Sequence, residues 1–374
     1  MKPSTITHIS TVHTAFDTRI FHKECKSLAK RGVSVNLVIT YPQEEVIDGV
    51  RIIPLPASKG RMSRIFIKPF LALSKALGTR ADIFHFHDPE LIPMGILLKL
   101  FGKKVIYDVH EDVPCQVLNK HWVSPHMRHL VSYMVYGIES LCSRFFDGIV
   151  GATPYITNTF LKRNRNSVNV NNYPLKNEVL KLGAGIDLKT KKDKSICYVG
   201  SITKTRGIFE ILDAIEGTDI KLHLAGVTAP KNLINTLEKH NGWKNVVYYG
   251  LVGRDEVCSI LSSSQLGICI LNPTPSYVKS IPVKLFEYMG AGLPVIASNF
   301  PFWRELVGNL DNVCFVDPLD PIAIRTAMYT LLSDKEKCHS IGIKGINAVK
   351  DTYNWENEEI KLVEFYKKLG ARIA

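Results

Sequence analysis

The chain has 374 residues, of which 45% are hydrophobic, and carries a formal net charge of +12. This length is sufficient for two domains with separate hydrophobic cores. None of the eight cysteines forms a C-x-x-C pair and most lie in apolar runs, which indicates buried, reduced thiols in a cytosolic protein and argues against disulfides or a cysteine zinc site.

The sequence shows neither a secretory signal segment nor an apolar run long enough to cross a bilayer. No apolar signal segment follows Met1, and every apolar run is shorter than the roughly 20 residues of a membrane span. We therefore expect a soluble or peripheral protein. Residues 1–175 hold 22 Lys and Arg against 13 Asp and Glu, so most of the net charge lies in this half. Such an excess favours an anionic partner: lipid head groups, phosphates or nucleic acid.

Short apolar segments alternate with helical patterns in the first half. They read as near-continuous apolar runs, which is typical of parallel strands buried on both faces. Residues 17–32 have the pattern of a helix that ends at Gly32, just after Lys30 and Arg31. The strands predicted in this half are residues 7–11, 34–40, 82–87, 104–109, 148–153 and 167–172.

Polar residues follow the first and third of these strands. Asp17 and Arg19 come after the first strand, where Arg19 would hold a phosphate or, alternatively, lie in solvent beside an Asp17 helix cap. His85, His87 and Asp88 end the third strand, and the alternation of a strand puts the two histidines on one face. This pair lacks a convincing third ligand, so we predict a polar turn that lines a cleft and no metal site.

The fourth strand is followed by His110, Glu111 and Asp112. His110 is a candidate for contact with a substrate, and the alternative is a histidine that caps a helix or lies in the core. Two basic segments accompany these strands, residues 58–80 and 119–137, the second of which contains Trp122. Both combine Lys and Arg with exposed apolar positions, so they favour contact with anionic lipid or, alternatively, form ordinary solvated helices.

The second half repeats the alternation of strands and helices. Residues 170–187 are rich in Asn, Pro and Gly and are the predicted join, and residues 254–264 have a helical pattern that begins with acidic residues. A second series of β-α units predicts a second doubly wound parallel sheet, so the chain is expected to be two Rossmann-like domains. The strands predicted here are residues 195–200, 220–226, 245–250, 265–270, 294–298 and 312–317.

Two turns of the second half suit a nucleotide. Residues 197–215 read as a strand, a turn at Gly200, a basic loop with Lys204 and Arg206, and a helix that begins near Gly207. Cations and free N–H groups at a helix start bind a diphosphate, although ordinary surface basics would look the same. Residues 248–257 form a similar turn, in which the backbone at Leu251 and Val252 would pair with a nucleobase edge, unless it is a plain strand-to-helix turn.

The segment "SIPVKLFEYMGAGLPVIAS" (residues 280–298) carries the strongest signal. Pro282 suits the first turn of a helix, on which Lys284 and Glu287 are neighbours at i and i+3. Glu287 would accept hydrogen bonds from ribose hydroxyls and Lys284 would meet phosphate. The alternative is a surface salt bridge between the two, with Leu285 in the buried stripe of the helix.

This segment resembles the donor-site signature of the GT-B glycosyltransferases of family 4, which is Glu-x7-Glu followed by small residues and Pro-Val-Ile. Glu287 matches the second Glu, whereas Lys279 stands at the first. The match is better to a variant, S-x-P-x-K-x-x-E-Y, found in bacterial polysaccharide clusters such as those for O-antigen or capsule. "YVGSITKTRG" is similar to the family's Gly-Arg-x4-Lys-Gly turn, with Ser201 at the Arg position and Arg206 at the Lys position.

The resemblance implies two domains that face each other across a cleft. These are residues 1–175, an acceptor-side domain to which a terminal helix at about 355–374 returns, and residues 176–354, the donor domain. It implies a retaining transferase in which the leaving phosphate takes the acceptor proton, so that no metal or other cofactor is needed. The implied catalytic residues are His110 (beside the donor sugar), Arg206, Lys284 and Glu287. The implied donor-binding residues are Gly200, Ser201, Lys204, Arg206, Leu251, Val252, Ser280, Lys284, Leu285 and Glu287, and the acceptor side comprises Asp17, Arg19, His87, Asp88 and Asp112.

The expected substrates are a nucleotide diphosphate sugar and a lipid-linked or growing cell-surface glycan. The protein is then expected on the cytoplasmic face of the inner membrane, in contact with anionic lipid. Two alternatives share the fold: a nucleotide-sugar 2-epimerase and a catalytically silent scaffold, the latter suggested by the departures at Lys279 and Ser201. A nucleic-acid-binding protein is disfavoured, because the basic residues are not interleaved with aromatics that stack on bases.

Overall fold

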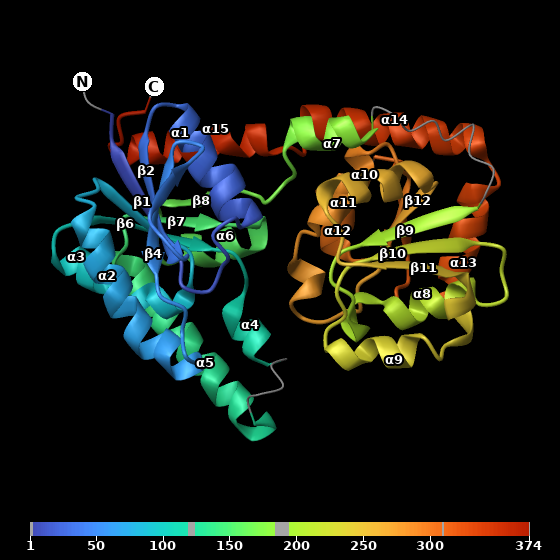
Figure 1. Ribbon diagram of the computed structural model, residues 1–374, viewed down its shortest axis with the longest axis horizontal. Helices are drawn as coiled ribbons and strands as arrows, with labels where there is room; N and C mark the ends of the chain where they lie inside the picture. Colours follow the sequence, from blue (N-terminus) through green and yellow to red (C-terminus); the bar gives the residue numbers. More distant parts are fainter. Residues whose placement is uncertain (1–2, 119–123, 184–193, 309, 374) are drawn as a thin grey trace. The chain divides into compact units, whose positions relative to one another are not determined.

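The computed structural model describes residues 3–118, 124–183, 194–308 and 310–373 (Figure 1). The chain divides into two compact units. Unit 1 comprises Met1–Asn172 and Trp355–Ala374, and unit 2 comprises Tyr173–Asn354. Both ends of the chain therefore belong to unit 1. No helix in the described ranges combines the length and hydropathy needed to cross a membrane.

Unit 1 is built on one sheet with the strand order β3-β4-β2-β1-β5-β6-β7-β8. All neighbouring strands run parallel except β3, which is antiparallel to β4. The bounds of the strands are β1 Thr5–Ile9, β2 Ser34–Thr40, β3 Glu45–Ile47, β4 Val50–Leu55, β5 Ile83–Phe86, β6 Lys104–Val109, β7 Gly148–Gly151 and β8 Ser167–Asn169.

The helices of unit 1 pack around this sheet. The chain begins its first crossover with a π-helical segment and ends with a helix, α15, that packs on β8 and on that π-helical segment. Their bounds are η1 Thr18–Cys25, α1 Lys26–Lys30, η2 Ser63–Ile67, α2 Lys68–Gly78, η3 Pro89–Leu91, α3 Ile92–Leu100, α4 Val113–Val117, α5 Pro125–Cys142, η4 Ser143–Phe145, α6 Pro154–Leu161 and α15 Trp355–Lys368.

Unit 2 is built on a wholly parallel sheet with the order β11-β10-β9-β12-β13-β14. The strands are β9 Ser195–Val199, β10 Lys221–Ala225, β11 Val246–Gly250, β12 Leu266–Cys269, β13 Val295–Ser298 and β14 Val313–Val316. The helices are α7 Lys176–Gly183, η5 Lys204–Arg206, α8 Ile208–Ile215, η6 Lys231–Leu233, α9 Ile234–Leu237, η7 Asn241–Asn245, α10 Arg254–Ser263, η8 Tyr277–Lys279, α11 Val283–Gly290, α12 Pro301–Val307, α13 Pro321–Leu332 and α14 Lys335–Asp351.

The prediction of two doubly wound parallel sheets is confirmed, since each of the twelve predicted segments overlaps a strand. The prediction missed β3 and β4, which add an edge to unit 1. The missed signal was local: Asp48 and Gly49 join the two strands with φ angles of 50° and 79°. An Asp-Gly pair with positive φ at both positions is the preferred two-residue hairpin turn.

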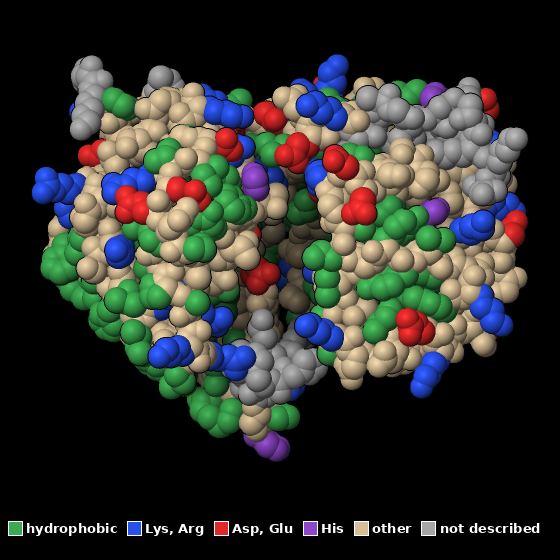
Figure 2. Space-filling model, viewed as in Figure 1, with side chains coloured by type: hydrophobic (Ala, Val, Ile, Leu, Met, Phe, Trp, Pro, Cys, Tyr) green, Lys and Arg blue, Asp and Glu red, His purple; other side chains and the backbone are tan. Residues whose placement is uncertain are grey.

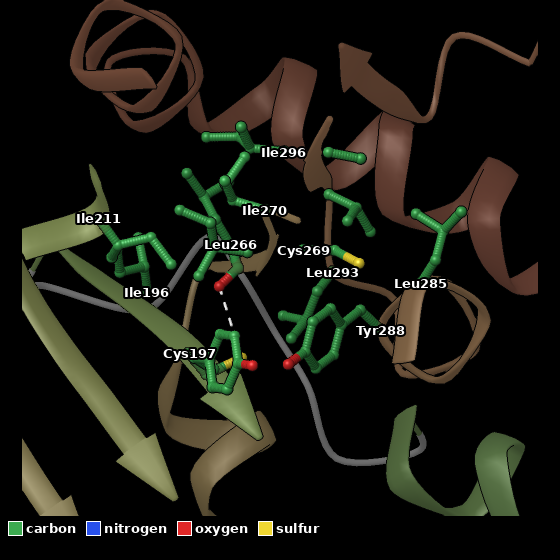
Figure 3. Close-up of a cluster of buried hydrophobic side chains, with 14 of the residues drawn as sticks. Ile196, Cys197, Ile211, Leu266, Cys269, Ile270, Leu285, Tyr288, Leu293 and Ile296 are labelled. Carbon is green, nitrogen blue, oxygen red and sulfur yellow. Dashed lines mark hydrogen bonds between the residues drawn. The ribbon is translucent and has the colours of Figure 1, made fainter. Parts of the chain in front are cut away.

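The core of unit 2 is apolar and closely packed, as expected for a sheet covered on both faces (Figure 3). Tyr288 of α11 lies close to Cys197 of β9, and Leu285 of the same helix belongs to this buried core together with Leu266 and Ile296 of the central strands. Their burial holds α11 directly behind the ends of β9 and β12. At about 25 cal/mol per Å² of buried apolar surface, such contacts supply the main free energy that fixes the helix.

Each sheet reverses its winding order once. In unit 2 the chain adds β10 and β11 on one side of β9 and then crosses to β12 on the other side. In unit 1 the same reversal separates β1 from β5. In open α/β sheets, ligands bind at the carboxyl ends of the strands beside such a switch point. The two candidate regions are therefore the ends of β9 and β12, and the ends of β1 and β5.

Candidate active site

At the switch point of unit 2, Lys284 has no counter-ion among the residues that the structure describes. Its Nζ lies 3.5 Å from the centroid of the buried Tyr198 ring, and it forms no hydrogen bond within the described residues although it is buried. The Tyr198 hydroxyl donates to Ser201 O at 2.8 Å, which holds the ring in place. A buried ammonium that lacks a hydrogen-bond acceptor is energetically unfavourable, so this arrangement is poised to bind an anion.

The turn after β9 leaves room for such an anion. Gly200 has a φ of 133°, and a Cβ atom added there would lie 3.6 Å from Lys284 Nζ. Gly200 N donates to Ala225 O, and the Cβ of an alanine at Gly226 would lie only 1.9 Å from Gly200 O. These contacts require glycine at 226 and bring the backbone of the Gly200 turn up to the lysine.

Arg206 provides a second cation in the same region. Burial acts to lower the pKa of its guanidinium, but the hydroxyls of Tyr277 and Tyr198 raise it, and the net shift is upward. Burial raises the pKa of the Cys269 thiol to about 11, a shift that Lys284 and Arg206 partly offset, so both cations lie near the end of β12. Arg206 directly precedes Gly207, the N-cap of α8, so the helix start adds free N–H groups beside it.

Glu287 lies on the same helix as Lys284 but has a different neighbour. Its Oε1 is 3.5 Å from Arg254 Nη1, and Arg254 Nη2 is 2.8 Å from Glu178 Oε2. The Glu287 side chain is 29% exposed, so its carboxylate remains accessible to a ligand. The alternative of a salt bridge between Lys284 and Glu287 is not what forms: the lysine turns toward Tyr198 and the glutamate toward Arg254.

The other predicted donor-side residues differ in how much they offer to a ligand. Ser201, Lys204 and Leu251 are exposed, and Val252 is half-buried in the turn between β11 and α10. Ser280 Oγ donates to Tyr277 O and its carbonyl accepts from Trp303 Nε1, so it braces the loop ahead of α11. Leu285 is fully buried and its N–H is bonded to Pro282 O, which makes it a core residue that positions α11.

In unit 1, Asp108 organises a cluster of histidines at the end of β6. His110 Nε2 lies 2.9 Å from Asp108 Oδ2 and 3.1 Å from His87 Nδ1, and His87 Nδ1 is itself 3.0 Å from the same carboxylate oxygen. The His110 side chain is 15% exposed, so it is the member of this trio that can reach a ligand. Burial of His87 lowers its pKa to about 4 in spite of Asp108, which keeps this imidazole neutral near pH 7.

The structure does not leave Arg19 available for a phosphate. Its side chain is buried and donates through Nε and Nη2 to the two oxygens of Asp108, at 3.0 and 2.9 Å, and through Nη1 to Val170 O. Glu24 Oε1 also lies 3.0 Å from Arg19 Nε. The sequence predicted that this arginine borders a cleft. Its side chain instead points into unit 1, where it meets Glu24 of η1 and Asp108 of β6. Its guanidinium is therefore fully occupied by protein groups.

Asp17 and Asp88 hold the loop that follows β1. Asp17 Oδ1 accepts from Arg19 N and Ile20 N, so this residue is the helix cap of the alternative interpretation. Asp88 is buried, and its Oδ2 accepts from Ser10 Oγ at 3.0 Å and from Thr11 N at 2.5 Å. Asp88 thus closes the turn at the switch point of unit 1, and Asp17 remains one-quarter exposed.

Asp112 is also a helix cap, since its Oδ1 accepts from Cys115 N at 3.0 Å at the start of α4.

His13 is a residue that sequence reasoning missed. Its Nδ1 lies 3.3 Å from Asp17 Oδ2, its Nε2 lies 3.5 Å from Asp88 Oδ1, and its ring centre is 5.0 Å from that of His110. Burial acts to lower the pKa of His13, but the hydrogen bond to Asp17 and the nearby carboxylates produce a net rise. The signal in the sequence was weak: His13 is a histidine that follows the first predicted strand, as His110 follows the fourth.

Comparison with known proteins decides the class of the donor-side domain. Residues 185–348 match the family of glycosyl transferases group 1. This range covers most of unit 2, including Gly200, Arg206, Lys284 and Glu287. This segment is therefore similar to glycosyl transferases group 1, in agreement with the predicted glycosyltransferase.

Relatives extend the likeness to the rest of the chain. D-rhamnosyltransferase WbpZ of Pseudomonas aeruginosa is 23% identical over 279 residues, which is 72% of this chain and 68% of that protein. The sucrose-phosphate synthase structure from Thermosynechococcus elongatus has a TM-score of 0.74 at 18% identity, with 98% and 99% of the two chains covered. Anabaena HepE in complex with UDP-glucose has a TM-score of 0.72 at 12% identity, with 98% and 100% covered. The GT-B fold predicted from the sequence is confirmed by these structures.

Proposed function

We propose that the protein is a retaining glycosyltransferase that moves a sugar from a nucleoside diphosphate sugar to a lipid-linked or growing cell-surface glycan at a membrane. The observation that carries this proposal is the buried, unpartnered Nζ of Lys284 at the switch point of unit 2. Lys284 and Arg206 neutralise the diphosphate as it leaves, which is where negative charge develops in sugar transfer. Glu287 accepts from the ribose hydroxyls, and the exposed turn at Leu251 and Val252 meets the base.

The metal-independent character of this transfer is part of the proposal. Two fixed cations and the start of α8 supply positive charge at the diphosphate, so the residues need no divalent ion to neutralise it. The role of His110 beside the donor sugar rests on the family resemblance, and its imidazole is held in place by Asp108 at 2.9 Å. The retaining course is supported by the resemblance of residues 280–298 to the family 4 signature. Proton NMR of the product formed from a sugar nucleotide of known anomer would contradict it by showing the inverted anomer.

Thermal shift with UDP, GDP, ADP, dTDP and CMP tests the donor site. A nucleotide that binds only the folded protein at 100 times its Kd adds about 2.7 kcal/mol to the stability. We expect one nucleoside diphosphate to stabilise the wild type, and Glu287→Ala and Lys284→Met to abolish most of this effect. The matched control is Lys344→Met, which removes a lysine paired with Asp311 on the surface of the same unit. No stabilisation of the wild type by any of the five would favour the silent scaffold.

Contact with a membrane is supported by an exposed apolar face of unit 1, which we call the apolar face. On α5, Met127, Leu130, Met134, Ile138 and Leu141 follow one stripe of the helix and are each 47–59% exposed. α3 packs on this helix and α2 packs on α3, and Figure 2 shows hydrophobic side chains gathered at the lower left of unit 1. A stripe of this kind on a soluble domain marks an interaction surface. The remaining exposed members on η2, α2 and α3 are Met62, Phe66, Ile67, Phe70, Leu71, Leu100 and Phe101.

Basic side chains border the apolar face. Lys59, Arg61 and Lys75 are exposed on the segment that carries η2 and α2, and the predicted lipid-binding segment 58–80 therefore combines apolar and basic groups. In the second predicted segment, 119–137, residues 119–123 and with them Trp122 lie outside the described residues. Apolar side chains that enter the head-group region, together with Lys and Arg, favour an anionic lipid surface.

Co-sedimentation with vesicles tests the membrane contact. We expect binding to vesicles that contain phosphatidylglycerol, and at least about 10-fold weaker binding by the double variant Phe70→Ser and Met134→Ser, because each loses apolar burial in the bilayer. Ile322→Ser is the control, since Ile322 is 75% exposed on α13 of unit 2. Absence of binding by the wild type would instead favour a soluble acceptor. The likeness to a sucrose-phosphate synthase structure suggests a sugar phosphate as that second candidate.

A further inference from the structure

Four potential metal ligands converge inside unit 1, on the buried side of His87 that faces away from His110. They are His8 on β1, Glu24 on η1, and His85 and His87 at the end of β5. The parallel register sets His8 beside His85, and alternation along β5 puts His87 on the same face. One ligand atom from each residue lies within 4.8 Å of the others, and all four side chains are buried.

The potential ligand atoms are incompletely bonded to the protein. Glu24 Oε2 and His85 Nε2 are buried and have no hydrogen-bond partner within the described residues. His8 Nδ1 and His87 Nε2 share a hydrogen bond of 3.0 Å, which an ion would replace, and His8 Nδ1 lies 3.7 Å from Glu24 Oε2. A zinc ion with bonds of about 2.0–2.1 Å in tetrahedral geometry needs ligand atoms roughly 3.3 Å apart. These two distances bracket that value, and the four ligand atoms all lie within 4.8 Å of one another, whereas the unbonded buried atoms of Glu24 and His85 are costly without an ion.

The outward-facing atoms of the same residues are held by other groups. His87 Nδ1 is 3.0 Å from Asp108 Oδ2, and His85 Nδ1 is 2.5 Å from the hydroxyl of Tyr366 on α15. Glu24 Oε1 is 3.0 Å from Arg19 Nε. Metal-binding histidines commonly donate their second nitrogen to a carboxylate or another fixed group, which sets the tautomer and the ring orientation. Here such a partner frees His85 Nε2 and His87 Nε2 to face the centre of the cluster.

The charges of this region also leave room for a cation. The guanidinium of Arg19 contacts two buried carboxylates, Asp108 and Glu24. One positive charge therefore faces two acidic groups, and the excess negative charge is balanced either by a proton on Glu24 or by a divalent ion.

We propose that His8, Glu24, His85 and His87 bind a structural zinc ion in unit 1. Three imidazole nitrogens and one carboxylate oxygen are ligands that zinc accepts, and together they fill all four tetrahedral positions, as in sites where zinc serves stability and not catalysis. The ion would join β1, β5 and η1, three segments that are far apart in the sequence. The trio of His87, Asp108 and His110 is a poorer site, because Asp108 is already bound by Arg19 on both oxygens.

Metal analysis of the untagged protein, grown with zinc and passed through gel filtration, tests this site. We expect about one zinc per chain, and after Co²⁺ substitution the visible absorption of a tetrahedral ion. X-ray absorption should give four nitrogen or oxygen neighbours at about 2.0–2.1 Å, no sulfur, and the multiple scattering of about three imidazole rings. A wild-type protein that contains no stoichiometric zinc, and that zinc does not stabilise after treatment with a chelator, would overturn the proposal and leave a proton on Glu24.

Variants separate this site from other places where zinc could bind. His85→Gln and Glu24→Gln should reduce the bound zinc at least 10-fold. His110→Gln should retain it, as should His240→Gln, which removes a histidine from the exposed group of Asp213, Glu216 and His240 in unit 2. Zinc that is lost in His240→Gln and retained in His85→Gln would overturn the proposal. If the two ligand variants fail to fold, the coordination measured by X-ray absorption on the wild type decides the question.

Discussion

At the scale of single residues, Lys284 shows how a binding group differs from a structural one. Its ammonium is buried against Tyr198 without an acceptor, and the nearest backbone belongs to the Gly200 turn. A lysine kept for stability would be paired, as Lys344 is with Asp311. The free energy that folding loses by burying this charge is recovered when an anionic ligand binds.

The effect of Lys284→Met on the unliganded protein follows from this argument. Replacing an unpaired buried cation by an apolar side chain of similar length should raise the free energy of unfolding by about 1 kcal/mol, because the desolvation penalty disappears. At the same time the variant should bind nucleoside diphosphates roughly 10- to 100-fold more weakly, since it loses a charge-assisted hydrogen bond. Urea unfolding and calorimetric titration measure the two effects, and a variant less stable than the wild type would instead assign a structural role to Lys284.

The environment of Glu139 leads us to expect that stability depends on pH. On the otherwise solvent-facing helix α5 this side chain is buried, and its carboxylate accepts a hydrogen bond from the Tyr107 hydroxyl at 2.9 Å. Burial raises the pKa of its carboxyl from 4.5 to about 7. Between these pH values the folded state holds a proton that the unfolded state has released, so the contribution of Glu139 to stability falls as the pH rises.

The variant Glu139→Gln isolates this contribution, because glutamine mimics the protonated acid at every pH. We expect it to be more stable than the wild type at pH 8 by about 3 kcal/mol and nearly equal to it at pH 4. Chemical unfolding at a series of pH values gives the difference between the two proteins, in which other titrating groups such as His13 cancel. A difference that is constant with pH would show that the pKa of Glu139 is the same in the folded and unfolded states.

At the scale of elements, the turns on either side of β10 depend on glycine for different reasons. Gly226 and Gly217 both have positive φ, at 138° and 70°. A Cβ atom at Gly226 would lie 1.9 Å from Gly200 O, whereas one at Gly217 would meet nothing within 4 Å. The first glycine is therefore required by the close approach of two strand-to-helix turns, and the second only by its backbone conformation.

We expect Gly226→Ala to lower the free energy of unfolding by about 3 kcal/mol or more and to weaken nucleotide binding, since the backbone at Gly200 must move. Gly217→Ala is the matched control and should cost about 1–2 kcal/mol, the penalty of an L-residue in the left-handed region. Unfolding in urea and thermal shift with the preferred nucleotide measure both. Equal losses in the two variants would show that the Gly200 and Gly226 turns are free to separate.

At the scale of the whole molecule, unit 1 is completed by α15, a helix that follows unit 2 in the sequence. Phe365 on α15 is buried, and its ring fills the space beside Gly148 of β7. Glu358 of the same helix accepts from Asn171 N at 2.9 Å, and Trp355 Nε1 donates to Ser27 Oγ at 2.8 Å. Residues that follow all of unit 2 in the sequence thus complete the core and the polar contacts of unit 1.

Phe365→Ala should therefore destabilise unit 1 by about 3–5 kcal/mol, through lost burial and the cavity that remains. Hydrogen exchange should become faster in β7 and β8, while the strands of unit 2 and the stabilisation by nucleotide are retained, because the two units have separate cores. Ile360→Ala is the control on the same helix, where the side chain is 50% exposed, and should change stability by no more than about 0.5 kcal/mol. Equal loss of protection in both units would show that they unfold as one.

Local sequence patterns were sufficient to predict the two sheets and the strands and helices of the donor side. Strand and helix periodicity are properties of short segments, so the twelve strands, the turn at Gly200 and the helix of Lys284 and Glu287 could all be predicted, whereas the short hairpin of β3 and β4 was missed. Only the tertiary structure decided the partner of each charge. Arg19 meets Asp108 across 89 residues, and Lys284 meets Tyr198 across nearly half the length of unit 2. His85 and His87 join His8 and Glu24 through strand register and helix packing. Exposure and electrostatic energy depend on such neighbours in space, and no local pattern records them.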